Sequence, residues 1–203
     1  LSPMAWRMVM RRSPNRWMTI VGDTAQTSNP AGVERWEDAL SPYMKNRWHS
    51  FTLSVNYRTP AQIMEASSGV LAEINPTAQQ PRSIRRSAYD VELIDRADNT
   101  WLVVLQQTVH HMQNFHPGEK RTCGILVSPA VMGDLQAVMD TTILDRTVLD
   151  AAVSLVQDAK GLEFDYVIIA DPVGMVEASP QGLNDLFVAM TRATQALAIV
   201  HDG

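Results

Sequence analysis

Four short polar segments, far apart in the sequence, contain residue types that bind nucleotides. They span residues 22–26, 56–58, 159–164 and 189–193. The planar guanidinium groups of Arg58 and Arg192 can each hold phosphate oxygens through two parallel hydrogen bonds. Tyr57 offers an aromatic face to a base, and the Glu163 carboxylate can accept hydrogen bonds from sugar hydroxyls. Together these side chains predict a nucleotide site.

Each segment also has an ordinary structural explanation when it is considered alone. Gln26 lies in a polar turn after an apolar stretch, where it could orient a water molecule or a terminal phosphate. Gly161 fits a tight turn, and it also allows the backbone to approach a ligand closely. Arg192, near the end of an expected helix, could interact only with the helix dipole. The functional interpretation therefore depends on the four segments acting jointly.

Apolar strands and amphipathic helices alternate between these segments. Helices are expected at residues 3–12, 33–44, 59–74 and 101–112, after residues 128–129, and from residues 179–180 to the segment with Arg192. Strands are expected at residues 17–21, 51–53, 91–94, 124–127, 152–156, 166–170 and 196–200. This alternation indicates an α/β fold with a parallel sheet covered on both faces. Ligands of such sheets bind at the carboxyl ends of the strands.

The helix that follows Arg58 has a characteristic start. Thr59 is placed to cap it, Pro60 suits the first turn, and Gln62 completes a capping box. The segment 56–58 would therefore lead directly into a rigid element.

The composition indicates a folded globular protein. Of the 203 residues, 45% are apolar and 19% are charged. No apolar run reaches the roughly 18 residues that a membrane span needs. The net charge of −5 gives no general attraction to nucleic acid, so any such contact would be local. The single cysteine, Cys123, indicates a reducing, cytoplasmic compartment.

The tryptophans and the histidines are not predicted to take part in the nucleotide site. Four of the five tryptophans lie in the first quarter of the sequence, and we expect them to anchor a core: Trp6, Trp17, Trp36 and Trp48. The five histidines show no metal-ligand spacing, so no metal site is predicted in the chain itself.

In their order, the four polar segments resemble the later motifs of the UvrD/Rep-type superfamily 1 helicases. The chain contains counterparts of the family's glycine-aspartate-x-x-glutamine, asparagine-tyrosine-arginine, lysine-glycine-leucine-glutamate and threonine-arginine motifs. Arg58 follows Gln26 by 32 residues (58 − 26), which is similar to the family's spacing. The resemblance spans residues 22–201.

The resemblance implies a role for each residue toward ATP and its Mg²⁺. Gln26, Arg58 and Arg192 would contact the γ-phosphate. Tyr57 would stack on adenine, and Glu163, in the turn of Gly161, would hold the ribose.

The resemblance also implies a domain organisation. Residues 1–50 would end a first RecA-like domain, and residues 51–203 would form a second one of the P-loop NTPase type. The chain lacks the family's phosphate loop and Mg²⁺-binding acidic motif. We therefore expect a piece of a larger ATPase, inactive alone, whose partner is an N-terminal motor domain of the same protein.

The sequence departs from the DNA-unwinding members in two further ways. Only 102 residues (160 − 58) separate Arg58 from Lys160, where those members usually carry a large inserted subdomain. No aromatic residue follows Gln26 in residues 27–31, and Gln157 replaces a usual histidine. Both positions contact DNA in the family, so these changes weaken the case for a processive DNA helicase.

These departures resemble the HelD-type branch, which acts on RNA polymerase. Residues 163–165 and the basic cluster Arg82, Arg85 and Arg86 fit that branch. The cluster could contact nucleic acid or a partner protein, or it could be a solvated loop. Three functions stay open: a helicase or translocase acting on single-stranded or duplex DNA, a polymerase-associated ATPase, and a non-catalytic module that kept the fold.

Overall fold

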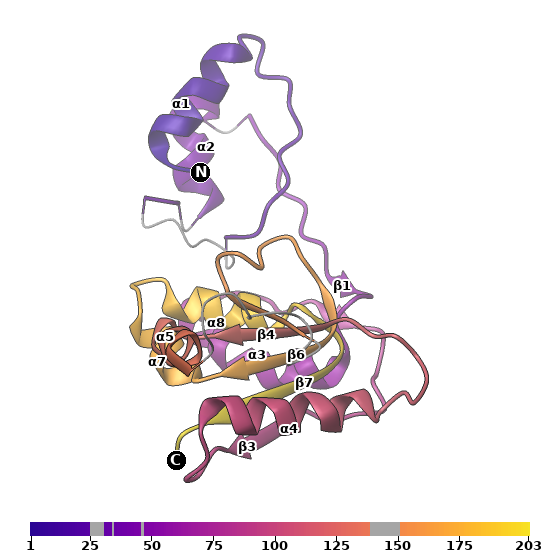
Figure 1. Ribbon diagram of the computed structural model, residues 1–203. Helices are drawn as coiled ribbons and strands as arrows, with labels where there is room; N and C mark the ends of the chain where they lie inside the picture. The colour runs from indigo at the N-terminus through magenta and orange to yellow at the C-terminus, as the bar shows by residue number, and fades with distance from the viewer. Residues whose placement is uncertain (25–30, 34, 46, 139–150) are drawn as a thin grey trace.

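The computed structural model describes residues 1–24, 31–33, 35–45, 47–138 and 151–203. Its main body contains a five-stranded sheet in which all neighbouring strands are parallel (Figure 1). The spatial order is β3 (Glu92–Asp95), β7 (Ala193–His201), β6 (Phe164–Ala170), β4 (Cys123–Val127) and β5 (Ala152–Leu155). The five strands expected between residues 91 and 200 are confirmed, with ends shifted by a few residues.

Helices cover both faces of this sheet because its central strands are apolar on both sides. Along β6, Tyr166, Ile168 and Ala170 pack on one face, and Val167 and Ile169 pack on the other. The first face is covered by α4 (Trp101–Gln113) and α5 (Pro129–Val138). The second is covered by α3 (Ala61–Ile74), α7 (Pro172–Glu177) and α8 (Gly182–Met190). The predicted fold class, α/β with a parallel sheet between two layers of helices, is confirmed.

The first fifty residues contain a second, smaller core. Helices α1 (Pro3–Arg12) and α2 (Trp36–Met44) pack together beside the sheet body (Figure 1). The buried residues of this core are Trp6, Met10, Ala39 and Leu40. Trp36 and Trp48 pack against them, as expected. The proposed boundary near residue 50 stays a prediction.

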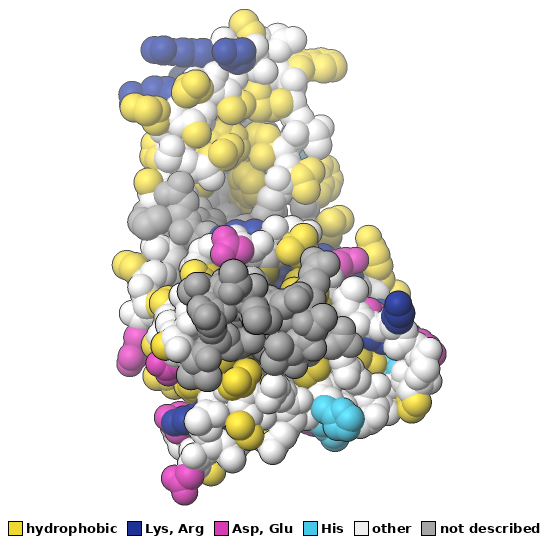
Figure 2. Space-filling view, in the orientation of Figure 1, with side chains coloured by type: hydrophobic (Ala, Val, Ile, Leu, Met, Phe, Trp, Pro, Cys, Tyr) yellow, Lys and Arg dark blue, Asp and Glu magenta, His cyan; other side chains and the backbone are white. Residues whose placement is uncertain are grey.

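The strands expected at residues 17–21 and 51–53 are absent from the structure. Trp17 is 89% exposed and Phe51 is also 89% exposed, so the expectation that Trp17 anchors a core is wrong. A strand buries its apolar side chains only where neighbours satisfy its backbone hydrogen bonds. No strand pairs with these segments in the described part of the chain, and Figure 2 shows many hydrophobic side chains on the surface over α1 and α2.

The start of α3 differs from the expected capping box. The Asn56 side-chain oxygen, not Thr59, accepts hydrogen bonds from the backbone N–H groups of Arg58 (2.9 Å) and Thr59 (3.1 Å). Gln62 instead exchanges two hydrogen bonds with the backbone of Ser87. Asn56 belongs to β1 (Val55–Asn56), which pairs with β2 (Arg82–Ser83) in a short parallel ladder. The backbone around Arg58 is therefore held by an Asn56 turn.

Candidate functional site

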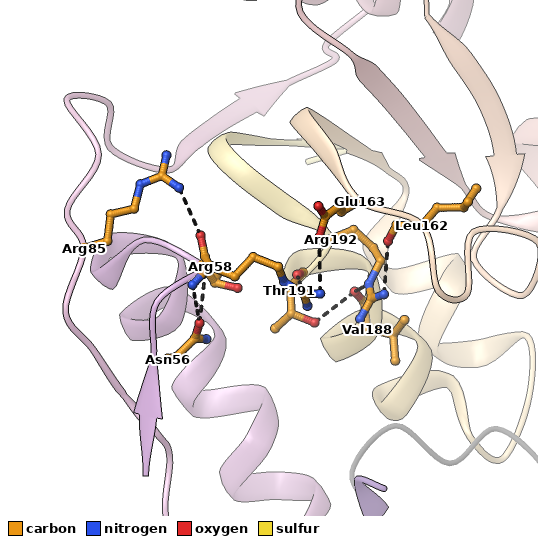
Figure 3. Close-up of polar contacts among 9 residues, drawn as sticks. Asn56, Arg58, Arg85, Leu162, Glu163, Val188, Thr191 and Arg192 are labelled. Carbon is orange, nitrogen blue, oxygen red and sulfur yellow. Dashed lines mark hydrogen bonds and ion pairs between the residues drawn. The ribbon is translucent and has the colours of Figure 1, made fainter. Parts of the chain in front are cut away.

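Three of the four polar segments meet at one edge of the sheet. Glu163 directly precedes β6 and Arg192 directly precedes β7, so both lie at the amino ends of their strands. Figure 3 shows the Arg58 side chain extended toward them from the start of α3. Its Nη1 lies 3.5 Å from Glu163 Oε2, and its Nη2 lies 3.5 Å from the carbonyl oxygen of Thr191. The sequence predicted a ligand site at the carboxyl ends of the strands. The cluster instead lies at their amino ends, because Glu163 and Arg192 belong to the connections that enter β6 and β7.

The Arg192 side chain is held beneath this edge. Its Nε donates to the Val188 carbonyl oxygen (3.3 Å), and its Nη1 donates to the Leu162 carbonyl oxygen (3.1 Å) (Figure 3). Only 4% of the residue is exposed. Helix α8 ends at Met190 with Thr191 as its cap, so Arg192 lies just beyond the helix rather than inside it as predicted. The backbone N–H of Phe164 donates to the Arg192 carbonyl, which fixes the start of β7.

Charges of both signs surround the Arg192 guanidinium. Burial lowers the pKa of Arg192, and the positive charge of Arg58 lowers it further. The carboxylates of Glu163 and Asp23 act in the opposite direction. Arg192 remains protonated because an arginine does not lose its charge in proteins. Two guanidinium groups and two carboxylates thus act on one another at this edge.

Asp23 links the first polar segment to this site. Its negative charge favours the charged form of Arg192 and so acts to raise the pKa of that guanidinium. Gln26, the residue predicted to contact the γ-phosphate in this segment, lies outside the described residues.

The ion pair between Arg58 and Glu163 is weak. Their side chains are 40% and 59% exposed, and such surface pairs contribute about 0–1 kcal/mol. Either side chain can therefore turn toward a ligand at little cost. Tyr57 is 77% exposed beside Arg58, so its ring is accessible.

The turn before Glu163 has the predicted shape. Gly161 has a φ of +80°, a left-handed conformation that glycine adopts without steric cost, and a Cβ there would meet no atom within 4 Å. Lys160 points toward α8, where its Nζ lies 3.8 Å from Asp185 Oδ1. Asp185 was not singled out from the sequence. The available signal was one carboxylate among apolar residues of a helix.

The basic cluster divides into two parts. Arg85 is half-buried and its Nη1 donates to the Arg58 carbonyl oxygen (3.4 Å), so it supports the site from within (Figure 3). Arg82 and Arg86 are exposed, and Arg86 Nη1 lies 3.8 Å from Glu65 Oε1. Only Arg82 and Arg86 are thus presented for an outside contact.

The comparisons with known proteins agree with the predicted resemblance. Residues 150–200 match the family model of the UvrD-like helicase C-terminal domain. This UvrD-like segment contains Gly161, Glu163 and Arg192, and it excludes Tyr57 and Arg58. The matched residues span β5, β6, α7, α8 and all of β7 except His201.

The chain was also compared with solved structures and with curated proteins. Fifty-five chains of solved structures match this chain. One is the C-terminal domain of a possible DNA helicase from Lactobacillus plantarum WCFS1, 19% identical, with a TM-score of 0.47 over 73% of this chain and 88% of that one. The comparison with curated proteins gave no match. Among the described residues, no helix has both the length and the apolar character that crossing a membrane requires.

Proposed function

We propose that this chain is the C-terminal motor half of an ATP-dependent superfamily 1 helicase or translocase. It would complete an ATP site together with an N-terminal motor domain of the same protein. The observation that carries the proposal is the meeting of Arg58, Glu163 and Arg192, which come from three separate segments of the chain. The family match over residues 150–200 supports it.

The residues at this edge fit a nucleoside triphosphate. Bound ATP would supply the phosphate charge that the paired guanidinium groups of Arg58 and Arg192 neutralise. Glu163 would accept hydrogen bonds from the ribose, and the exposed ring of Tyr57 would stack on adenine. The ligands of Mg²⁺ would come from the N-terminal motor domain.

The two arginines differ in accessibility, and this difference suggests an order of contact. The Arg58 side chain is 40% exposed and reaches a ligand directly. Arg192 is 4% exposed, so contact with phosphate requires the groups that cover its guanidinium to move. Such a movement would couple phosphate binding and release to a displacement of the turn and of α8, which is how a motor converts charge into domain motion.

A polymerase-associated ATPase is the second candidate. The segment between Arg58 and Lys160 supplies α3, β2, β3, α4, β4, α5 and β5, and all of these except β2 belong to the sheet body. The described part of this segment thus holds no inserted subdomain of the kind that the DNA-unwinding members carry. Exposed Arg82 and Arg86 would then contact RNA polymerase or its nucleic acid.

Three assays on the full-length protein separate the candidates: ATP hydrolysis, strand separation and co-purification with RNA polymerase. A helicase hydrolyses ATP in response to DNA and separates strands. A HelD-like ATPase hydrolyses ATP, co-purifies with RNA polymerase and does not separate strands. A non-catalytic module does not turn over ATP at all, and that result would refute the proposal.

Replacing Glu163 by glutamine is expected to raise the KM for ATP about tenfold, because the charged acceptor of the ribose hydrogen bonds becomes a weaker, neutral one. The kcat should change less than about twofold, since a ribose contact is equal in the ground and transition states. Steady-state ATP turnover of the full-length protein measures both. Glu73→Gln, at an exposed position on α3, is the matched control. A fall in kcat with unchanged KM would contradict the ribose role.

A further inference from the structure

A buried carboxylate lies beneath the turn that leads to Glu163. Asp185, on α8, is only 3% exposed, and burial raises its pKa. Removing a carboxylate from water costs several kcal/mol unless polar partners compensate for it. The partners of Asp185 therefore indicate what this residue is for.

Both partners of Asp185 come from the connection between β5 and β6. Gln157 Nε2 donates to Asp185 Oδ2 at 2.8 Å, and Lys160 Nζ lies 3.8 Å from Oδ1. Oδ1 accepts no hydrogen bond in the described part of the chain. The carboxylate thus attaches the β5–β6 connection to α8. The cost of burying this charge is offset only while that connection keeps its position.

The loop and the helix each lead to one half of the candidate site. Glu163 follows Lys160 by three residues (163 − 160), and Arg192 follows Asp185 by seven (192 − 185), just beyond the end of α8. The Leu162 carbonyl, in the same turn, accepts the hydrogen bond from Arg192. A shift of the turn relative to α8 would therefore separate Glu163 from Arg58 and would also remove a partner of Arg192.

We propose that Asp185 is a positioning residue that holds the Lys160–Glu163 turn against α8 and so keeps Glu163, Arg58 and Arg192 in register. Its effect on the turn is independent of any ligand. Its effect on ATP turnover rests on the proposed function. The lysine and the carboxylate act as one unit in this arrangement, so removing either releases the same contact.

Amide hydrogen exchange of the full-length protein without nucleotide tests the positioning role. Asp185→Asn keeps the shape of the side chain and can still accept from Gln157, but it loses the attraction for Lys160. We expect this variant and Lys160→Met each to speed exchange of the peptide covering residues 157–163 about tenfold. The probes are the hydrogen-bonded amides of Asp158, Ala159 and Leu162. Exchange in α4, on the opposite face, should stay unchanged.

The double variant and a neighbouring control make the test specific. Asp185→Asn combined with Lys160→Met should exchange no faster than the faster single variant, because both remove one contact. Asp158→Asn, an exposed carboxylate in the same connection, should match the wild type. Additive effects, unchanged exchange at residues 157–163, or faster exchange spread evenly over the sheet would each overturn the proposal.

ATP turnover supplies the second readout. Asp185→Asn should lower kcat about tenfold with the thermal midpoint within a few degrees of the wild type. Arg192→Ala is measured beside it. If Arg192→Ala leaves turnover unchanged, the proposed function fails. The amide exchange of residues 157–163 then still tests the positioning role of Asp185. If Arg192→Ala lowers turnover and Asp185→Asn does not, the positioning role fails and the proposed function stands.

Discussion

Replacing Arg192 by alanine is expected to lower ATP turnover of the full-length protein by about 10³-fold or more, the range of arginines that act on a transferring phosphoryl group. ATP binding should change less than about threefold, because the charge that Arg192 meets develops mainly in the transition state. Single-turnover hydrolysis and nucleotide titration measure the two quantities separately.

Folding must be checked in the same variant, because Arg192 also bridges Val188 and Leu162. Losing both hydrogen bonds costs on the order of 1–3 kcal/mol of stability. The thermal midpoint therefore decides whether the variant is folded at the assay temperature. Arg192→Lys keeps a charge without the fork geometry and should also be slow. Arg11→Ala, an exposed position on α1, is the control expected to turn over ATP normally. Normal turnover by Arg192→Ala would remove it from the phosphate site.

Replacing Gly182 by alanine is expected to lower the free energy of unfolding by about 3 kcal/mol, near the upper end of overpacking effects. A Cβ at this position would lie 1.9 Å from the Val176 carbonyl oxygen. That oxygen belongs to the backbone at the end of α7, so no side-chain rotation relieves the clash. Helix α8 would have to move, and α8 carries Asp185 and leads to Arg192.

The matched control is Gly69→Ala on α3, where a Cβ meets nothing within 4 Å. That variant should be more stable by about 0.4–1 kcal/mol, because alanine suits a helix interior and restricts the unfolded chain. Urea denaturation of both variants measures the difference. Equal denaturation midpoints for the two variants would contradict the prediction. They would mean that the connection between α7 and α8 can shift at little cost, so that α8 is not held in place by this contact.

The sheet body was largely predictable because its strands are continuous apolar runs. Residues 124–127 and 166–170 are buried on both faces, so their composition alone indicates a central parallel strand. Residues 17–21 and 51–53 have similar composition, but no strand pairs with them in the described structure. An apolar run predicts a tendency to pair, and a pairing partner decides whether a strand forms.

The sequence proposed Arg58, Glu163 and Arg192 as members of the candidate site, and it could not predict their geometry. Arg58 and Glu163 are 105 residues apart, and only the fold brings them within 3.5 Å. The burial of Arg192 could not be foreseen, since it depends on the Leu162 and Val188 carbonyls that hold the side chain. Asp185 was not predicted as part of the site because its partners, Gln157 and Lys160, lie in another segment of the chain.

The central claim is that Arg58 and Arg192 act on the γ-phosphate from the side opposite the phosphate loop. The most direct measurement is the affinity of the full-length protein for ADP with aluminium fluoride, a mimic of the transferring phosphoryl group, relative to ADP alone. The wild type should bind the mimic at least about a hundredfold more tightly. Arg58→Ala and Arg192→Ala should each lose most of that preference while binding ADP normally. An unchanged preference in both variants would contradict the claim.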